Sequence, residues 1–192
     1  MRKQDKDWNG KPEALLWVDV ETTGVDRDLD ELLEVGMRCT SVDATETYGT
    51  LTRLVKPQCL TLDDFTPVSF SMHCDSGLLP ALLDSEPSRV NRKAVTDAIL
   101  EFLDSLAQRF TLVPAGTNVD FDIDFLKRLN LNPDAWLSYR KFDLTTLRRY
   151  IRFLDCPEDP YKGHAGSHRV RDCIRRDISD YRWYRKLLKG AW

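Results

Sequence analysis

The sequence of 192 residues lacks long hydrophobic runs, paired cysteine motifs and a large excess of either charge. Its longest unbroken apolar stretch, 14–18, is far shorter than the roughly 20 residues that cross a bilayer. Residues 1–11 also lack the apolar segment of a signal peptide. The five cysteines form no C-x-x-C pair, and their odd number favours reduced thiols over a disulfide framework. These absences predict a cytoplasmic protein with no membrane partner.

Charge is unevenly distributed along the chain, although the net value is only −3. Residues 140–192 carry 14 basic and 7 acidic side chains, whereas residues 1–139 carry 14 basic and 24 acidic ones. An acid-rich body can hold cations, although charged helix faces in water would give the same composition. No repeat, low-complexity tract or Gly/Ser linker divides the chain, so we expect a flexible tail at 1–12 and one domain at 13–192.

Hydrophobic periodicity predicts a mixed α/β sheet. Apolar or alternating stretches indicate three successive strands, at 14–20, 32–42 and 46–55. Spacing and capping residues in the second half predict four helices and one further strand: helices after Asn91, over 120–129, after Asp143 and after His168, and a strand at 111–115. Gly49 marks a possible bulge, the proline-interrupted stretch 57–90 predicts short helical turns, and 155–167 predicts a loop.

Two carboxylates, Asp19 and Glu21, share one face at the end of the first predicted strand. Residues two apart in a strand lie roughly 6.5 to 7 Å apart at Cα, on the same side. The residues before them are apolar on both faces, which indicates an interior strand where ionised carboxylates need a compensating positive charge. Mg²⁺ or Mn²⁺ would supply that charge, whereas a strand that emerges into water would leave both acids merely hydrated.

A third acid and a general base would have to come from elsewhere in the chain. Asp120, Asp122 and Asp124 are the densest candidates, and spacing alone does not choose among them, because on a helix Asp122 points about 200° away from both neighbours. Among the three histidines, His168 is the best placed for proton transfer, since it precedes a predicted helix with Asp172 four residues later. A simple charge interaction at a helix start would give the same pair.

Three motifs carry a resemblance to a known family: VDVETTG at 18–24, D-x-x-F-L at 122–126, and a late histidine followed by an acid before a helix. Together they resemble the DnaQ-like DEDD exonucleases of the His subclass. Within that family the chain is most similar to the oligoribonucleases, in patches from 15 to 187. The resemblance implies an α/β, RNase H-like fold with a mixed five-stranded sheet flanked by helices. It also implies a 3′–5′ exonuclease that degrades short single-stranded RNA to nucleoside 5′-monophosphates with two Mg²⁺ or Mn²⁺ ions.

The resemblance assigns roles to individual acids. Asp19 and Glu21 fill the first motif and Asp122 the second. One ion would then help to generate hydroxide and the other would stabilise the leaving 3′ oxygen. His168 takes the position of the general base that removes the proton of the attacking water.

The third motif departs from the family pattern, because Cys173 occupies the position of the metal-binding aspartate and Asp172 lies one residue early. One residue turns a helical side chain by about 100°. We expect Asp172 to supply the ligand through a locally altered helix. A Cys173 thiolate, which matches Mg²⁺ poorly, or a weakly held second ion are the alternatives.

Substrate contacts implied by the resemblance come from the patches 72–78 and 139–147 and from single positions. They are Val25 as a wedge between bases, His73 in the pocket, Asn118 at the 5′ phosphate, and Tyr139, Arg140 and Thr145 from the partner subunit of a homodimer. Val68 stands where the family has a stacking Trp, a loss of roughly 1 to 3 kcal/mol per base. Val68 therefore keeps one rival open, an exonuclease of the same fold acting on DNA or longer RNA. Cys173 keeps another open, a catalytically weak RNA-binding homologue.

Overall fold

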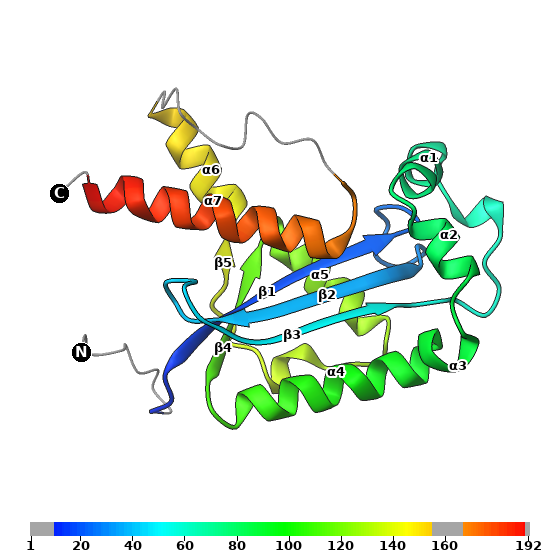
Figure 1. Cartoon of the computed structure of the whole chain (residues 1–192), viewed down its shortest axis with the longest axis horizontal. Helices are drawn as coiled ribbons and strands as arrows, with labels where there is room; N and C mark the ends of the chain where they lie inside the picture. Colours follow the sequence, from blue (N-terminus) through cyan, green and yellow to red (C-terminus); the bar gives the residue numbers. More distant parts are fainter. Residues whose placement is uncertain (1–9, 155–166, 191–192) are drawn as a thin grey trace.

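A mixed five-stranded sheet forms the centre of the computed structural model, which describes residues 10–154 and 167–190 (Figure 1). Its strands are β1 (Glu13–Thr22), β2 (Leu32–Thr40), β3 (Thr47–Leu54), β4 (Thr111–Gly116) and β5 (Phe142–Asp143). They lie in the order β3-β2-β1-β4-β5. β2 is antiparallel to both β1 and β3, whereas β4 is parallel to β1 and β5. The predicted mixed sheet is thus confirmed.

Seven α-helices occur in the described ranges. They are α1 (Pro67–Asp75), α2 (Leu78–Leu83), α3 (Pro87–Val90), α4 (Arg92–Ala107), α5 (Val119–Lys127), α6 (Leu144–Phe153) and α7 (Val170–Gly190). Two 3₁₀ turns, Leu62–Asp64 and Pro133–Ala135, complete the elements. The predicted caps are present, since Asn91 accepts a hydrogen bond from the amide of Ala94 and Asp143 accepts one from that of Thr145.

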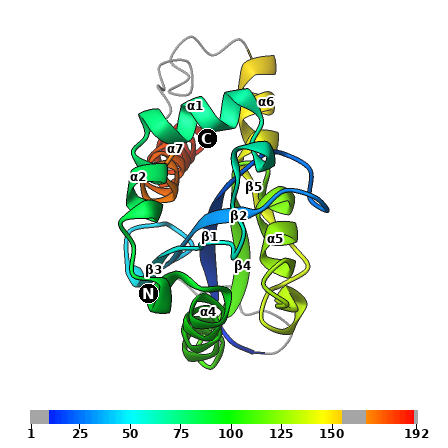
Figure 2. The same cartoon turned by 90° about the vertical axis from the view of Figure 1, so that its right-hand side faces the viewer.

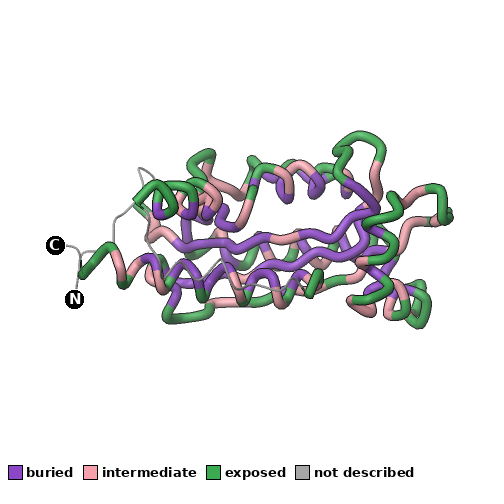
Figure 3. The backbone as a smooth tube through the Cα atoms, turned by 90° about the horizontal axis from the view of Figure 1, so that it is seen from above, coloured by how far each residue is buried: buried purple, intermediate pink, exposed green. Residues whose placement is uncertain are grey.

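Two hydrophobic layers cover the two faces of the sheet. Leu16 and Val18 pack with α4 and α5 on one face, whereas Leu15 and Trp17 pack with α6 and α7 on the other. Figures 1 and 2 show α4 and α7 on opposite sides of the sheet, and Figure 3 shows the central strands as buried along most of their length. Because strand side chains alternate, the odd-numbered residues that end β1 must face α7.

A glycine allows α7 to approach the sheet closely. Gly36 of β2 is paired with Asp19 of β1, and a Cβ atom at Gly36 would lie 2.8 Å from the Cβ of Val170 and 2.9 Å from the Cδ1 of Ile174. Any larger residue would push the start of α7 away from β1 and β2. This contact fixes the height of α7 above the end of β1.

Several boundaries differ from the sequence-based expectation. β1 continues to Thr22, beyond the predicted end at residue 20. The bulge expected at Gly49 is confirmed, because the β2–β3 register shifts beside that residue. Lys11 donates to the carbonyl of Ala107 and the carbonyl of Pro12 accepts from an amide, so both residues are attached to the body and do not belong to a loose tail. Residues 1–9 and 155–166 lie outside the described part. No helix within that part combines the length and apolarity needed to cross a membrane.

Candidate active site

The end of β1 and the first turns of α7 bring three possible metal ligands together. One ligand atom from each of Asp19, Glu21 and Cys173 lies within 4.8 Å of the other two. Oδ2 of Asp19 is buried and has no hydrogen-bond partner among the described residues. The Glu21 side chain is only 8% exposed, and Nδ1 of His73 lies 4.0 Å from one of its carboxylate oxygens. Two carboxylates therefore share a poorly solvated space, and no described residue donates a hydrogen bond to either of them.

Asp122 is the buried member of the three candidate acids on α5. It is 4% exposed, and its Oδ1 accepts a hydrogen bond from the backbone amide of Val20 at 3.0 Å. Asp120 and Asp124 instead pair with lysine side chains. The geometry thus separates residues that spacing could not, and places Asp122 against the end of β1.

Burial raises the pKa of each acid at this end of β1. The pKa of Asp19 is raised well above 3.8, first by burial and then by repulsion from Asp122 and Glu21. Burial is also the largest cause of the raised pKa of Asp122. The pKa of Glu21 rises from 4.5 to about 7, first through burial and then through repulsion from Glu34. Such a cluster is destabilised when ionised, so a divalent cation would relieve both its repulsion and its missing hydrogen bonds. These donors fit Mg²⁺ or Mn²⁺.

The start of α7 directs Cys173, not Asp172, into the carboxylate cluster. Asp172 accepts a hydrogen bond from Nη2 of Arg175 at 2.6 Å, and it lines a neighbouring cleft. The Cys173 side chain is buried and contributes its sulfur atom to the group with Asp19 and Glu21. The local alteration of the helix that would let Asp172 serve as the ligand is not observed.

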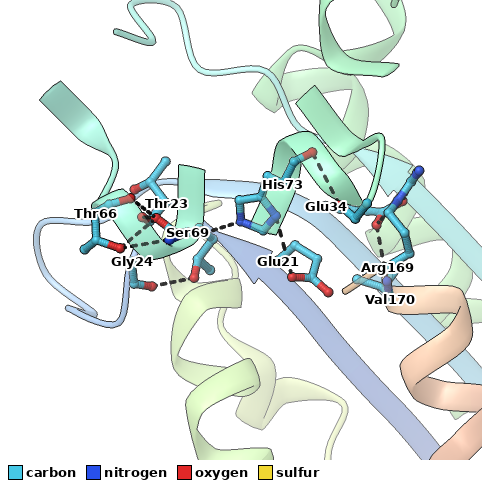
Figure 4. A network of polar contacts seen from close by, with 11 residues as sticks. Glu21, Thr23, Gly24, Glu34, Thr66, Ser69, His73, Arg169 and Val170 are labelled. Carbon is cyan, nitrogen blue, oxygen red and sulfur yellow. Dashed lines mark hydrogen bonds and ion pairs between the residues drawn. The ribbon is translucent and has the colours of Figure 1, made fainter. Parts of the chain in front are cut away.

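A bidentate contact fixes the start of α7. Glu34, buried in β2, accepts hydrogen bonds from Nε and Nη2 of Arg169 at 3.0 and 2.8 Å and from the amide of Val170 at 3.2 Å (Figure 4). The preceding residue, His168, has a left-handed φ of 49° and an exposed side chain. It lines the cleft between α1 and α7, which is formed by Pro67, Val68, Ser71, Met72, Asp75, Ser76, Ser167, His168, Arg169 and Asp172.

His73 of α1 lies on the other side of Glu21 and is fully buried. Its Nε2 donates to the carbonyl oxygen of Thr22 at 2.8 Å, whereas its Nδ1 has no hydrogen-bond partner among the described residues. Burial, the largest cause, lowers its pKa, so the ring is neutral near pH 7. Figure 4 shows the ring directed at Glu21, which makes His73 a wall of the cluster.

The remaining predicted contact residues lie at the surface and do not join the carboxylates. Val25 is 82% exposed, and Val68, 77% exposed, lines the cleft. Asn118 has a φ of 58°, and its amide donates to Oγ1 of Thr145 in the same chain at 3.1 Å. The guanidinium of Arg140 and the ring of exposed Tyr139 lie 4.9 Å apart.

A buried ionic network behind the cluster escaped the sequence analysis. Arg148 of α6 donates to Asp177 at 3.0 Å and to Asp180 at 2.6 Å, and all three side chains are at most 4% exposed. Asp177 contributes to the raised pKa of both Asp19 and Asp122. The spacing of four residues between Cys173 and Asp177 could have indicated that they share a helix face.

Arg176 is a second cation that sequence reasoning did not assign. Its charge lowers the pKa of Asp19, Glu21 and Cys173, in each case against the larger effect of burial. Its Nε is buried, has no hydrogen-bond partner in the described ranges and lies 3.6 Å from a carboxylate oxygen of Asp177. The cluster thus has partly compensating positive charge of its own, from Arg176 and, at Glu21, from Arg169 as well.

Comparisons with known proteins relate the whole chain to one class of nuclease in sequence. No protein-family model matches the chain. An oligoribonuclease of Leifsonia xyli subsp. xyli is 27% identical over 181 residues, which cover 91% of this chain and 83% of the relative. An oligoribonuclease of Francisella tularensis subsp. novicida is 25% identical over 174 residues, or 91% of this chain and 95% of the relative.

Solved structures share the fold at lower identity. The zinc-bound E. coli ExoI–ssDNA complex has a TM-score of 0.67 at 17% identity, covering 91% of this chain and 40% of that chain. Exonuclease I from Methylocaldum szegediense has a TM-score of 0.62 at 19% identity, covering 91% and 40% respectively. The chain is therefore oligoribonuclease-like in sequence, and the predicted RNase H-like fold is confirmed.

Proposed function

We propose that the chain is a metal-dependent 3′–5′ exoribonuclease that degrades short oligoribonucleotides to nucleoside 5′-monophosphates. The observation that carries this proposal is the group of buried acids at the end of β1. Among the residues that the structure describes, none donates a hydrogen bond to the buried Oδ2 of Asp19 or to the Glu21 carboxylate, and Asp122 is held against the same strand end. The oligoribonuclease-like sequence and the exonuclease fold support the same reaction class.

In this mechanism Asp19, Glu21 and Asp122 hold the cations, with the α7 residue beside them completing the set. Two bound Mg²⁺ or Mn²⁺ ions would lower the pKa of the attacking water and stabilise the leaving 3′ oxygen. His168 would accept the proton of the water, because its exposed side chain lies in the adjoining cleft and is free to exchange that proton with solvent.

Substrate binding in this proposal uses the cleft between α1 and α7 and the surface around it. His73 closes the pocket behind Glu21, Val25 separates neighbouring bases, and Asn118 receives the 5′ phosphate. Tyr139, Arg140 and Thr145 would act from the partner subunit of a homodimer. The exposure of two large apolar side chains, Tyr150 and Phe153, on the helix that carries Thr145 supports such an arrangement. Light scattering of the purified protein tests the dimer.

A second candidate function is an exonuclease of the same fold that acts on DNA or longer RNA. A groove beside the cleft favours it, with four arginines against two acids in its lining: Glu34, Arg38, Thr50, Thr52, Arg169, Arg171, Asp172 and Arg175. Arg169 and Asp172 line both the cleft and the groove, so a strand leaving the cleft would meet positive charge. The structural relative ExoI has been solved with single-stranded DNA.

The discriminating experiment compares 5′-labelled diribonucleotide, longer RNA and single-stranded DNA as substrates, in Mg²⁺ and in Mn²⁺. The proposal expects mononucleotides released one at a time from the 3′ end, with the highest kcat/KM on the shortest RNA. Asp122→Asn should abolish release, whereas Asp124→Asn, on the solvent side of the same helix, should not. Equal rates on all three substrates would favour the second function. Tight diribonucleotide binding with no release would indicate a binding homologue.

The location of the protein follows from its thiols in this proposal. The described cysteines Cys39, Cys59, Cys74 and Cys173 are all free. We therefore expect the protein to act in the reducing cytoplasm, where a fluorescent fusion should be found.

A further inference from the structure

The cation site contains a sulfur atom where oxygen is the usual donor for Mg²⁺. Ligand atoms of Asp19, Glu21 and Cys173 lie within 4.8 Å of one another. Atoms bound to one ion at about 2.0 to 2.3 Å lie roughly 3 to 4.5 Å apart. Small side-chain rotations would therefore bring all three donors onto a single ion.

The Asp19 carboxylate is unsatisfied in a way that points to a ligand, and the Glu21 carboxylate beside it accepts no hydrogen bond from the described residues. Oδ2 of Asp19 is buried with no hydrogen-bond partner in the described part of the chain. The Glu21 side chain is 92% buried, and its distance of 4.0 Å to Nδ1 of His73 is too long for a hydrogen bond. Buried polar atoms in native proteins almost always have partners, so a missing partner at this position calls for an ion.

Asp172 cannot take the place of Cys173 without dismantling the start of α7. A turn of about 100° would be needed to bring the neighbouring residue round to the cluster. That rotation would break the hydrogen bonds of Glu34 with Arg169 and Val170, and it would also remove the Val170 side chain from its close packing against Gly36.

We propose that the Cys173 thiolate is a metal ligand of this site beside Asp19 and Glu21, and that the site consequently prefers a thiophilic divalent ion such as Zn²⁺ or Co²⁺ over Mg²⁺. This inference rests on the same cation site as the proposed function. When the sulfur–metal bond forms, the S–H bond breaks and the proton leaves to solvent. Divalent Co²⁺ and Zn²⁺ also rank above Mn²⁺ in affinity for mixed oxygen and sulfur donors.

The test uses Co²⁺ as a spectroscopic probe of the full-length protein. Wild type should develop thiolate-to-cobalt charge-transfer absorption that saturates as one site fills. Cys173→Ser and Cys173→Asp should lose this absorption. Cys59→Ser, at an exposed cysteine that is distant from Cys173 in the sequence, should keep it. In competition titrations, the preference for Zn²⁺ over Mg²⁺ should fall at least about tenfold in Cys173→Asp. Circular dichroism verifies that the variants fold.

Two results would overturn the inference: no charge-transfer absorption in wild type, or the same absorption in Cys173→Ser. Failure of the inference is distinguishable from failure of the exonuclease function. Release of mononucleotides by Cys173→Ser in Mg²⁺, with cobalt absorption that does not depend on Cys173, would reject the thiolate ligand and keep the nuclease. Cobalt absorption that requires Cys173, with no nucleotide release by wild type or Cys173→Asp in any ion, would keep the thiolate ligand and reject the nuclease.

Discussion

Replacing Glu21 by Gln should stabilise the cation-free protein at alkaline pH and leave it unchanged at acid pH. Glu21 is almost fully buried, and its pKa rises from 4.5 to about 7 on folding, mainly through burial. Between these values the folded protein holds a proton that the unfolded chain has released, so the free energy of unfolding falls as the pH rises. Above about pH 7 the buried Glu21 is ionised and lowers the free energy of unfolding by about 3 kcal/mol, since each pKa unit corresponds to 1.36 kcal/mol.

Denaturant unfolding in EDTA between pH 4.5 and pH 8 measures this effect. The curves of wild type and Glu21→Gln should coincide near pH 4.5 and separate by up to about 3 kcal/mol at pH 8. Glu86→Gln, at an exposed glutamate paired with Arg89, should follow wild type throughout. Added Mn²⁺ at pH 8 should stabilise wild type more than Glu21→Gln, because the ion binds the folded carboxylate. Equal stability of the two proteins at pH 8, or a gap of the same size at pH 4.5, would refute the reasoning.

Three further substitutions test other parts of the structure. Gly36→Ala should lower the free energy of unfolding by about 1 to 3 kcal/mol, because the added Cβ forces α7 away from the sheet, and it should also lower kcat. Gly190→Ala, at a position with open space around it, should change neither quantity. Thermal melts measure the stability and single-turnover experiments measure the rate. Arg148→Met should destabilise by about 3 to 5 kcal/mol at pH 7 because two buried aspartates lose their partner, and a denaturant titration that finds less than 1 kcal/mol would contradict it. Arg38→Ala should make the slope of log affinity against log salt shallower by about 0.7 for single-stranded oligomers, measured by fluorescence anisotropy; an unchanged slope would place the strand elsewhere.

Local pattern was sufficient to predict the first half of the site. The alternation of a strand places Asp19 and Glu21 on one face whatever surrounds them, and the apolar residues before them show that this face is buried. The same rule predicted the meander of strands, whereas helical spacing and the cap Asn91 predicted α4. Helical spacing could not choose Asp122, because the orientation of α5 depends on which side packs on β1.

The third motif could not be predicted because distant residues set the rotation of α7. The contact from Glu34 to Arg169 spans 135 positions, and the space above Gly36 determines how closely Val170 can approach. These contacts turn Cys173 inward and leave Asp172 beside Arg175. Sequence reasoning, which followed the chemistry of Mg²⁺, favoured the aspartate. The ion pairs of Arg148 could not be predicted either, because the residues around it in the sequence do not indicate that this arginine of α6 is buried.

The separation of β1 and α7 along the sequence has a consequence for synthesis of the protein. Asp19 and Glu21 leave the ribosome well before Cys173, which lies in α7. On the proposed function, a nascent polypeptide that has emerged only as far as α6 would lack His168 as general base and would hold an incomplete set of ligands. The nuclease would therefore become competent only after α7 has been synthesised, and messenger RNA beside the ribosome would be spared by each copy that still lacks this helix.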